Sequence, residues 1–170
     1  MVDQMIEEIN KALDNDCYLV ALMTALTLPD ICGAVEYPND SEGSRYKKWY
    51  AKYIGKYETD GEDDNMPYAS ADIIYDLRCS MVHNGNPSVN LKKRDLKSFE
   101  LWITKDMTSG GGSSYCESTG ERTLELGIRN ICFKLCALAK YYYDHNKEKF
   151  NFNYIIKDMR GYDIWISKSH

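Results

Sequence analysis

Apolar residues recur every three or four positions through most of the chain, a spacing typical of helices that bury one face. Ile6, Ile9 and Leu13 predict an amphipathic helix over about the first fourteen residues. The next helix, residues 17–28, is apolar on most sides and is predicted to lie in the core, and Pro29 either kinks or ends it. Further helices are predicted from Ser44 to Tyr57, from about residue 70 to Asn84, and from Ile128 to about His145.

The pattern changes from helical spacing to alternation near residue 98. The segment 99–104 alternates and is rich in aromatic residues, which favours a strand, and residues 121–126 predict a returning strand. Glycine and serine dominate the stretch from Met107 to Gly120, which predicts a flexible loop. A short helix is expected near Tyr154–Met159. The predicted fold class is mainly α: a helical bundle in one domain, residues 1–170, with a two-stranded β-hairpin insertion at about 98–126.

Composition indicates a soluble protein. No apolar run is long enough to cross a bilayer, and the first residues do not form a basic segment followed by an apolar one, so we expect neither a membrane partner nor a signal peptide. The six cysteines contain no Cys-x-x-Cys pair and are expected to stay reduced in the cytoplasm, with Cys132 and Cys136 buried. The acidic run after Tyr57 lacks the ligand order of a calcium loop. We therefore expect no metal site and no cofactor.

The charge balance restricts how the chain could bind nucleic acid. A net charge of −5 argues against broad electrostatic capture of RNA or DNA but leaves room for a local patch. Arg45, Lys48 and Lys52 lie among tyrosines and a tryptophan, and are candidate RNA-binding residues on a helix whose rings could stack on bases. The alternative is an amphipathic helix that buries Tyr46, Trp49 and its neighbours while the lysines face water.

The candidate chemistry lies at the end of the helix that precedes Gly85. Arg78 offers a planar fork of donors suited to phosphate, and His83 can move protons near neutral pH. Five residues advance a helix by about 140° beyond a full turn, so the two side chains are predicted to lie on different faces. Two copies packed together could bring both pairs into one cleft and supply an acid and a base. Alternatively, Arg78 pairs with a carboxylate, such as Asp76 or one on another helix, and His83 only stabilises the helix end.

The segment from Tyr75 to Gly85 resembles the R-x4-6-H signature of HEPN domains, the higher eukaryotes and prokaryotes nucleotide-binding superfamily. Residues 28–33, 45–50 and 124–143 are similar in order and spacing to a bacterial branch of that superfamily, and the resemblance extends from about residue 17 to 145.

This resemblance implies a HEPN-like helical bundle, a homodimer and a metal-independent endoribonuclease of a toxin–antitoxin or anti-phage, abortive-infection type. Arg78 would contact the scissile phosphate of an RNA substrate, His83 would act on the 2′-hydroxyl or the leaving oxygen, and Asn84 would assist by hydrogen bonding. An antitoxin protein would be a further partner. Active members often carry a polar residue after the arginine, where this chain has Cys79. Cys79 and the net negative charge motivate the alternative of a non-catalytic module that binds a nucleotide or a protein.

Overall fold

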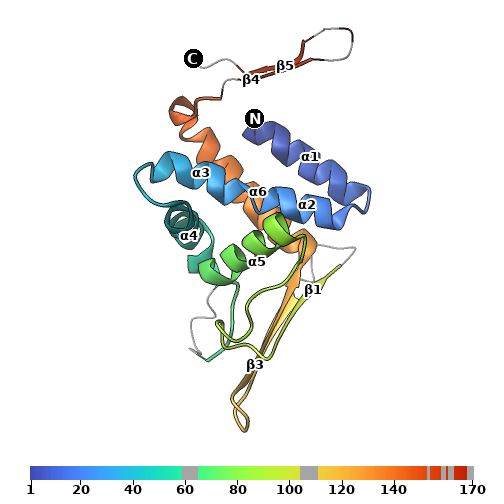
Figure 1. Ribbon diagram of the computed structural model, residues 1–170, viewed down its shortest axis with the longest axis vertical. Coiled ribbons are helices and arrows are strands. Elements are labelled where there is room, and N and C mark those ends of the chain that lie inside the picture. The colour runs from blue at the N-terminus through green and yellow to red at the C-terminus, as the bar shows by residue number, and fades with distance from the viewer. Residues whose placement is uncertain (59–64, 104–110, 153, 158–159, 161–162, 168–170) are drawn as a thin grey trace.

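Helices dominate the part of the chain that the computed structural model describes, which is residues 1–58, 65–103, 111–152, 154–157, 160 and 163–167 (Figure 1). The mainly helical fold class is therefore confirmed. The α-helices are α1 (Val2–Asp14), α2 (Tyr18–Ala25), α3 (Leu28–Glu36), α4 (Glu42–Tyr53), α5 (Ala71–Asn84) and α6 (Ile128–Asp144). Two 3-10 turns follow α4 and α6, at η1 (Gly55–Tyr57) and η2 (Lys147–Lys149).

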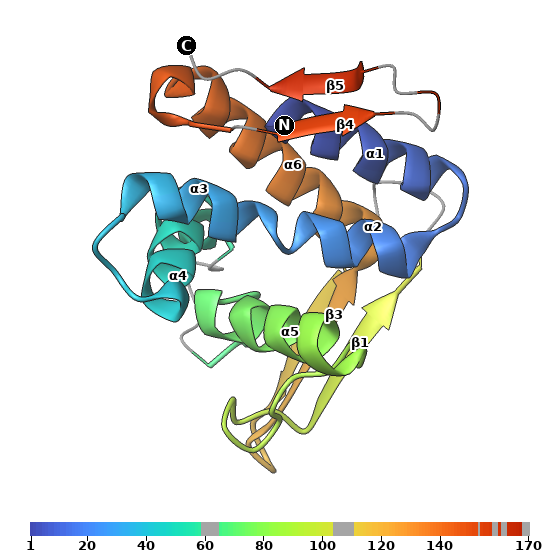
Figure 2. The same cartoon turned by 45° about the horizontal axis from the view of Figure 1, so that its top comes forward.

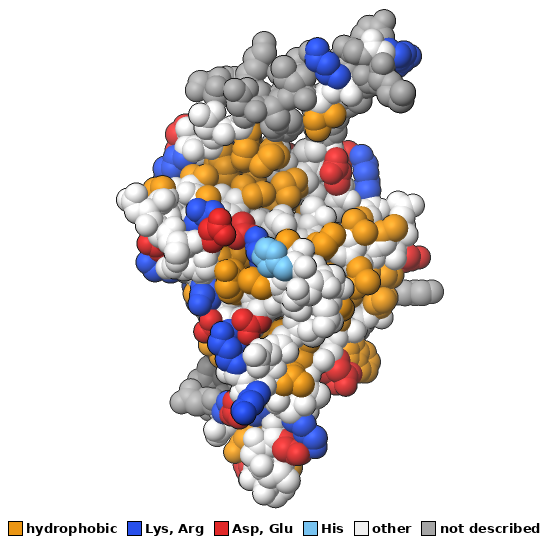
Figure 3. Space-filling view, viewed as in Figure 1, with side chains coloured by type: hydrophobic (Ala, Val, Ile, Leu, Met, Phe, Trp, Pro, Cys, Tyr) orange, Lys and Arg blue, Asp and Glu red, His pale blue; other side chains and the backbone are white. Residues whose placement is uncertain are grey.

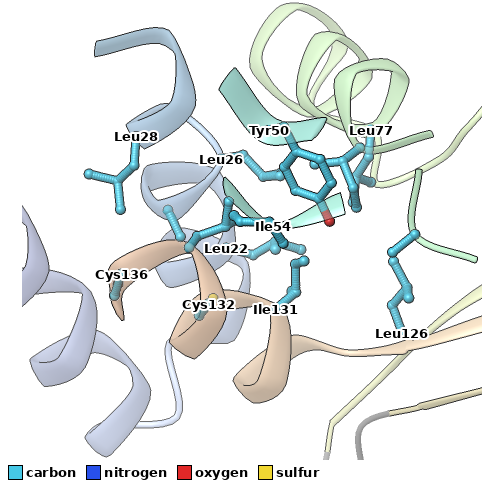
Figure 4. Packing of buried hydrophobic residues seen from close by; sticks show 14 of the residues in the cluster. Leu22, Leu26, Leu28, Tyr50, Ile54, Leu77, Leu126, Ile131, Cys132 and Cys136 are labelled. Atoms are coloured by element: carbon cyan, nitrogen blue, oxygen red, sulfur yellow. The ribbon is translucent and has the colours of Figure 1, made fainter. Parts of the chain in front are cut away.

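Helix α6 lies at the centre of the core and packs against α1, α2 and α3. Figure 1 shows it crossing behind α2 and α3. Its buried stripe includes Ile131 and Cys132, which face Leu22 of α2 and Leu26 at the end of that helix (Figure 4). Burial raises the pKa of Cys132 to about 12, so this sulfur packs as an uncharged thiol. The prediction of buried thiols is confirmed at Cys132 and Cys136, which are both free cysteines.

The predicted second helix continues as two helices instead of one. Helix α2 ends at Ala25, and α3 begins at Leu28 with Pro29 in its first turn, where a missing backbone N–H costs no helical hydrogen bond. Together they form the one described stretch, Tyr18–Glu36, that is long and apolar enough to cross a membrane by length and composition, with a mean hydropathy of 1.6. Core helices of soluble proteins pass the same test, and the buried side of this stretch supplies Ala21, Leu22 and other core residues.

The predicted two-stranded hairpin is wrong, because the sheet at this position has three strands. Strand β3 (Glu121–Gly127) is central, with β1 (Ser98–Trp102) parallel to it on one side and β2 (Gly111–Cys116) antiparallel on the other. Strand β2 occupies part of the stretch predicted to be a flexible loop; residues 104–110 lie outside the described part. Its side chains are nearly all exposed, so its sequence shows no alternation of apolar and polar residues. Only its backbone pairing with β3 makes it a strand.

Close backbone approach explains one glycine in β2. Gly111 has a φ of 96°, and a Cβ there would lie 2.0 Å from the carbonyl oxygen of Glu125 on β3. Only glycine fits this position, where the two backbones meet.

The C-terminal segment forms a second hairpin in which β4 (Tyr154–Lys157) pairs antiparallel with β5 (Asp163–Ser167). In Figure 2 the two strands run side by side. The short helix expected at Tyr154–Met159 is thus wrong for residues 154–157, and Met159 lies outside the described residues. Tyr154, Ile155 and Ile156 are aromatic or β-branched residues, which favour strands, and the segment forms a strand and not a helix.

Candidate active site

Helix α5 positions the predicted catalytic residues, and its sequence accounts for both of its ends. Ser70 caps the N-terminus by accepting a hydrogen bond from the backbone N–H of Ile73, at 3.3 Å. Gly85 ends the helix in the left-handed conformation, with a φ of 63°. The apolar side of α5 is buried at Ile73, Ile74, Leu77 and Met81. Arg78 and His83 are not among the buried residues of this helix.

Arg78 and His83 contact each other within one chain. Nη1 of Arg78 lies 3.2 Å from Nε2 of His83, so the prediction that they splay onto different faces is wrong. A rise of roughly 7.5 Å over five residues can be covered by the long arginine side chain as it extends along the helix. Because a guanidinium only donates hydrogen bonds, Nε2 of His83 accepts this one, and the ring then carries its proton on Nδ1.

Asp30, in the first turn of α3, completes this cluster. Nε of Arg78 donates to Oδ2 of Asp30 at 2.8 Å, and the two side chains are only 18% and 17% exposed. Burial raises the pKa of the Asp30 carboxyl group, and the charge of Arg78 opposes that shift. Burial lowers the pKa of Arg78, but the charge and hydrogen bond of Asp30, together with the neighbouring Cys79, outweigh that effect and raise it. The sequence left open that Arg78 pairs with Asp76 or with a carboxylate of another helix, and the second of these pairings is the one observed. Asp76 instead binds Arg94 through two hydrogen bonds.

Sequence reasoning missed Asp30 as a functional residue. It lies 48 positions before Arg78, and no periodicity joins two helices that are so far apart in the chain. Two signals were available: residues 28–33 belong to the family resemblance, and Asp30 follows Pro29 at a helix start, where a carboxylate is favoured by the helix dipole.

Arg45 of α4 brings a second guanidinium close to this cluster. Its positive charge lowers the pKa of Asp30, whereas Glu42 at the start of α4 raises it. Nε of Arg45 is buried and has no hydrogen-bond partner among the described residues. Helices α3, α4 and α5 thus meet where Arg78 binds Asp30 and the charge of Arg45 also acts on that carboxylate. Guanidinium groups are suited to an anion such as phosphate.

The other two predicted RNA-binding residues belong to a different part of α4. Lys48 pairs with Asp40 at 2.7 Å, and Lys52 pairs with Glu36 at 2.5 Å. The rings of Tyr46, Trp49 and Tyr50 are fully buried and unavailable for stacking on bases, which confirms the amphipathic alternative for these three. Of the predicted basic patch, only Arg45 lies beside the Arg78 cluster.

A groove of about 510 Å³ is lined in part by His83. Asn84, the third predicted catalytic residue, lines this groove and is exposed. Within the described residues, no group of three or more histidine, cysteine, aspartate or glutamate side chains is arranged to hold a metal ion. The chain matches no protein-family model, and no curated protein or solved structure is detectably similar to it.

Proposed function

We propose that this protein is a metal-independent endoribonuclease with a HEPN-like site built from Arg78 and His83. The observation that carries the proposal is the 3.2 Å contact between the guanidinium and the imidazole, next to a carboxylate that holds the arginine in place. A group that binds phosphate and a group that transfers protons are the two requirements for cutting RNA at its own 2′-hydroxyl. By the sequence resemblance, the biological setting is a bacterial toxin–antitoxin or anti-phage system.

The chemistry follows from the hydrogen-bonding capacity of Arg78. Its Nε donates to Asp30 and its Nη1 to His83, and the guanidinium also interacts with Cys79, so its remaining donors would bind the oxygens of a phosphate. When a phosphate draws Nη1 of Arg78 away from Nε2 of His83, that nitrogen is free to take the proton from the 2′-hydroxyl, and the 2′-oxygen attacks the neighbouring phosphorus. The bond from phosphorus to the 5′-oxygen breaks, leaving a 2′,3′-cyclic phosphate and a 5′-hydroxyl. Arg78 stabilises the charge that develops on the phosphoryl oxygens.

Protonation of the leaving 5′-oxygen requires a second acid, and we assign that role to His83 of a second copy. Support comes from apolar side chains that are exposed next to the site. Leu19, Val20 and Met23 of α2 are 55%, 55% and 40% exposed, and Val82, the neighbour of His83, is 39% exposed. Helices α2 and α5 pack against each other, and Figure 3 shows hydrophobic side chains gathered around α2. Exposed apolar side chains in such number are typical of a protein interface.

The direct test replaces His83 with alanine and measures cleavage of single-stranded RNA. Loss of the proton-transfer group should reduce the rate by about a hundredfold or more. His145→Ala is the matched control, since His145 is also exposed but lies at the end of α6. Wild-type cleavage should persist in EDTA. Undiminished cleavage by folded His83→Ala protein would remove the catalytic assignment.

The second candidate is a non-catalytic module that binds a nucleotide or a protein partner. The ion pair with Asp30 favours it, because a guanidinium that is already paired binds a phosphate less strongly. Growth after induction distinguishes the two, with wild type beside Arg78→Ala. Toxicity that disappears with Arg78 supports the ribonuclease, whereas a stable complex without RNA loss supports the module.

A further inference from the structure

The groove beside His83 has the wrong composition for a phosphate site and a suitable one for a nucleobase. Amide and hydroxyl side chains dominate its lining, with Val89 and Cys79 as its less polar part. Its one carboxylate, Asp76, is neutralised by Arg94 through two hydrogen bonds, of 2.5 and 2.8 Å. The volume of about 510 Å³ lies within the range of small-molecule sites, roughly 300–1,000 Å³. The polar side chains that line it are Ser80, Asn84, Asn86, Ser88 and Asn90, together with His83.

The loop that forms one wall of the groove is fixed in position. Gly85 and Asn86 donate backbone hydrogen bonds to the carbonyls of Met81 and Ser80, which turns the chain back along α5. The hydroxyls of Ser80 and Ser88 lie 3.2 Å apart and join the loop to the helix. Val89 is 9% exposed and packs into the main core. A wall held at both ends presents its polar groups in a defined arrangement.

Two amide side chains in this groove are unused. Asn84 and Asn86 make no side-chain hydrogen bond to any residue that the structure describes. An asparagine amide offers a donor and an acceptor side by side, which match the amino group and the adjacent ring nitrogen of adenine; unpaired cytosine carries the same pair, but its single ring fills less of a groove of this volume. Unpaired RNA bases are commonly recognised through such edge contacts.

The position of His83 connects the groove to the cluster around Arg78. His83 lines the groove, and its Nε2 contacts the guanidinium of Arg78. A nucleotide whose phosphate lies at Arg78 would therefore place its base in the groove. We propose that the groove binds an unpaired adenine next to the scissile phosphate, and so selects the position of the cut. This inference rests on the ribonuclease function proposed above.

The test measures binding separately from cleavage. Tetranucleotides with 2′-O-methyl riboses cannot be cut, because the attacking hydroxyl is blocked; each carries one variable base among uridines. We expect the adenine-containing oligonucleotide to bind about tenfold more tightly than the all-uridine one, as a single good bidentate contact would give. Asn86→Ala should remove that preference, and its side-chain amide signals should shift on binding in the wild type. Asn10→Ala, an exposed asparagine on α1, is the matched control.

Each outcome has a defined meaning. Equal affinity for all four variable bases, or an adenine preference that survives in Asn86→Ala, overturns the inference. Cleavage by the wild type without a preferred base at the cut also overturns it but leaves the ribonuclease proposal intact. Adenine-selective binding through Asn86, by a protein that cuts no RNA, supports the groove and refutes the ribonuclease.

Discussion

Asp30 is the residue that gives the Arg78 guanidinium a fixed direction. A lone arginine on a helix samples many rotamers, and ordering it costs about 2 kcal/mol of conformational entropy. The 2.8 Å hydrogen bond from Nε to Oδ2 of Asp30 restrains that side chain, so its Nη1 can meet His83. Asp30 is thus a positioning residue, and it need not touch RNA.

Replacing Asp30 with asparagine should separate positioning from folding. The amide keeps an acceptor for Arg78 but loses the charge that orients it, so we expect kcat to fall about tenfold or more. KM for RNA should not rise, because removing a carboxylate removes a group that repels phosphate. Steady-state kinetics with a labelled RNA would measure both constants.

The alanine variant and a control complete this experiment. Asp30→Ala leaves a half-buried guanidinium unpaired and should lower the free energy of unfolding by about 1–3 kcal/mol. Asp14→Ala, at an exposed carboxylate, is the control and should change neither kcat nor the free energy of unfolding. A rise in KM with unchanged kcat in Asp30→Asn would contradict the positioning role.

Arg78 and His83, the two residues proposed for the chemistry, were named from the sequence, but their spatial relation could not be predicted. Residue type and spacing identify Arg78 and His83 as candidates. The helical angle describes where Cα–Cβ bonds point, however, and an arginine side chain is long enough to reach around that angle. The contribution of Asp30 depends on how α3 packs near α5, which no local pattern encodes.

Among the elements, the packing of α3 on α4 decides how close Arg45 comes to the site. Gly33 of α3 lies against the backbone of α4, where a Cβ would be 2.8 Å from the carbonyl oxygen of Arg45. This close approach brings α4 near Asp30, which lies one turn earlier on α3. Helix–helix contacts at backbone distance require a residue without a side chain.

Gly33→Ala should destabilise the protein, although alanine is the better helix former. In an exposed helix this change stabilises by about 1 kcal/mol, whereas a clash with a backbone atom costs about 1–3 kcal/mol. We therefore expect a lower free energy of unfolding, measured by urea denaturation. Gly112→Ala is the control, since the nearest atom to its added Cβ is the end of a flexible glutamate, 3.8 Å away. A stabilised Gly33→Ala protein would refute the close packing of α3 on α4.

The elements that could be predicted from the sequence are those that bury a regular set of apolar side chains. Helices α1, α5 and α6 bury one apolar stripe each, and the period of that stripe predicted them. Strand β2 buries almost nothing, so its polar sequence resembled a loop. The parallel pairing of β1 with β3 joins segments through long-range contacts that alternation cannot report.

At the scale of the whole molecule, a single copy is an incomplete version of the proposed enzyme. It carries one Arg78–His83 pair, and cutting RNA needs both a base and an acid. The net charge of −5 also means that RNA must be captured by local groups and not by the general field. A dimer that brings two copies of the site together would supply the acid and double the local positive charge.

Val20→Lys should prevent that dimer and remove activity without touching the site. Val20 is 55% exposed, so a lysine there leaves the fold intact but would place a charge in the apolar surface of α2. We expect sedimentation to show a monomer where the wild type is a dimer, and RNA cleavage to fall in parallel. Tyr57→Lys, at a side chain that is 72% exposed on η1, is the control and should leave both unchanged. Full activity from a monomeric Val20→Lys protein would show that one copy suffices, and the acid would then have to come from within the same chain.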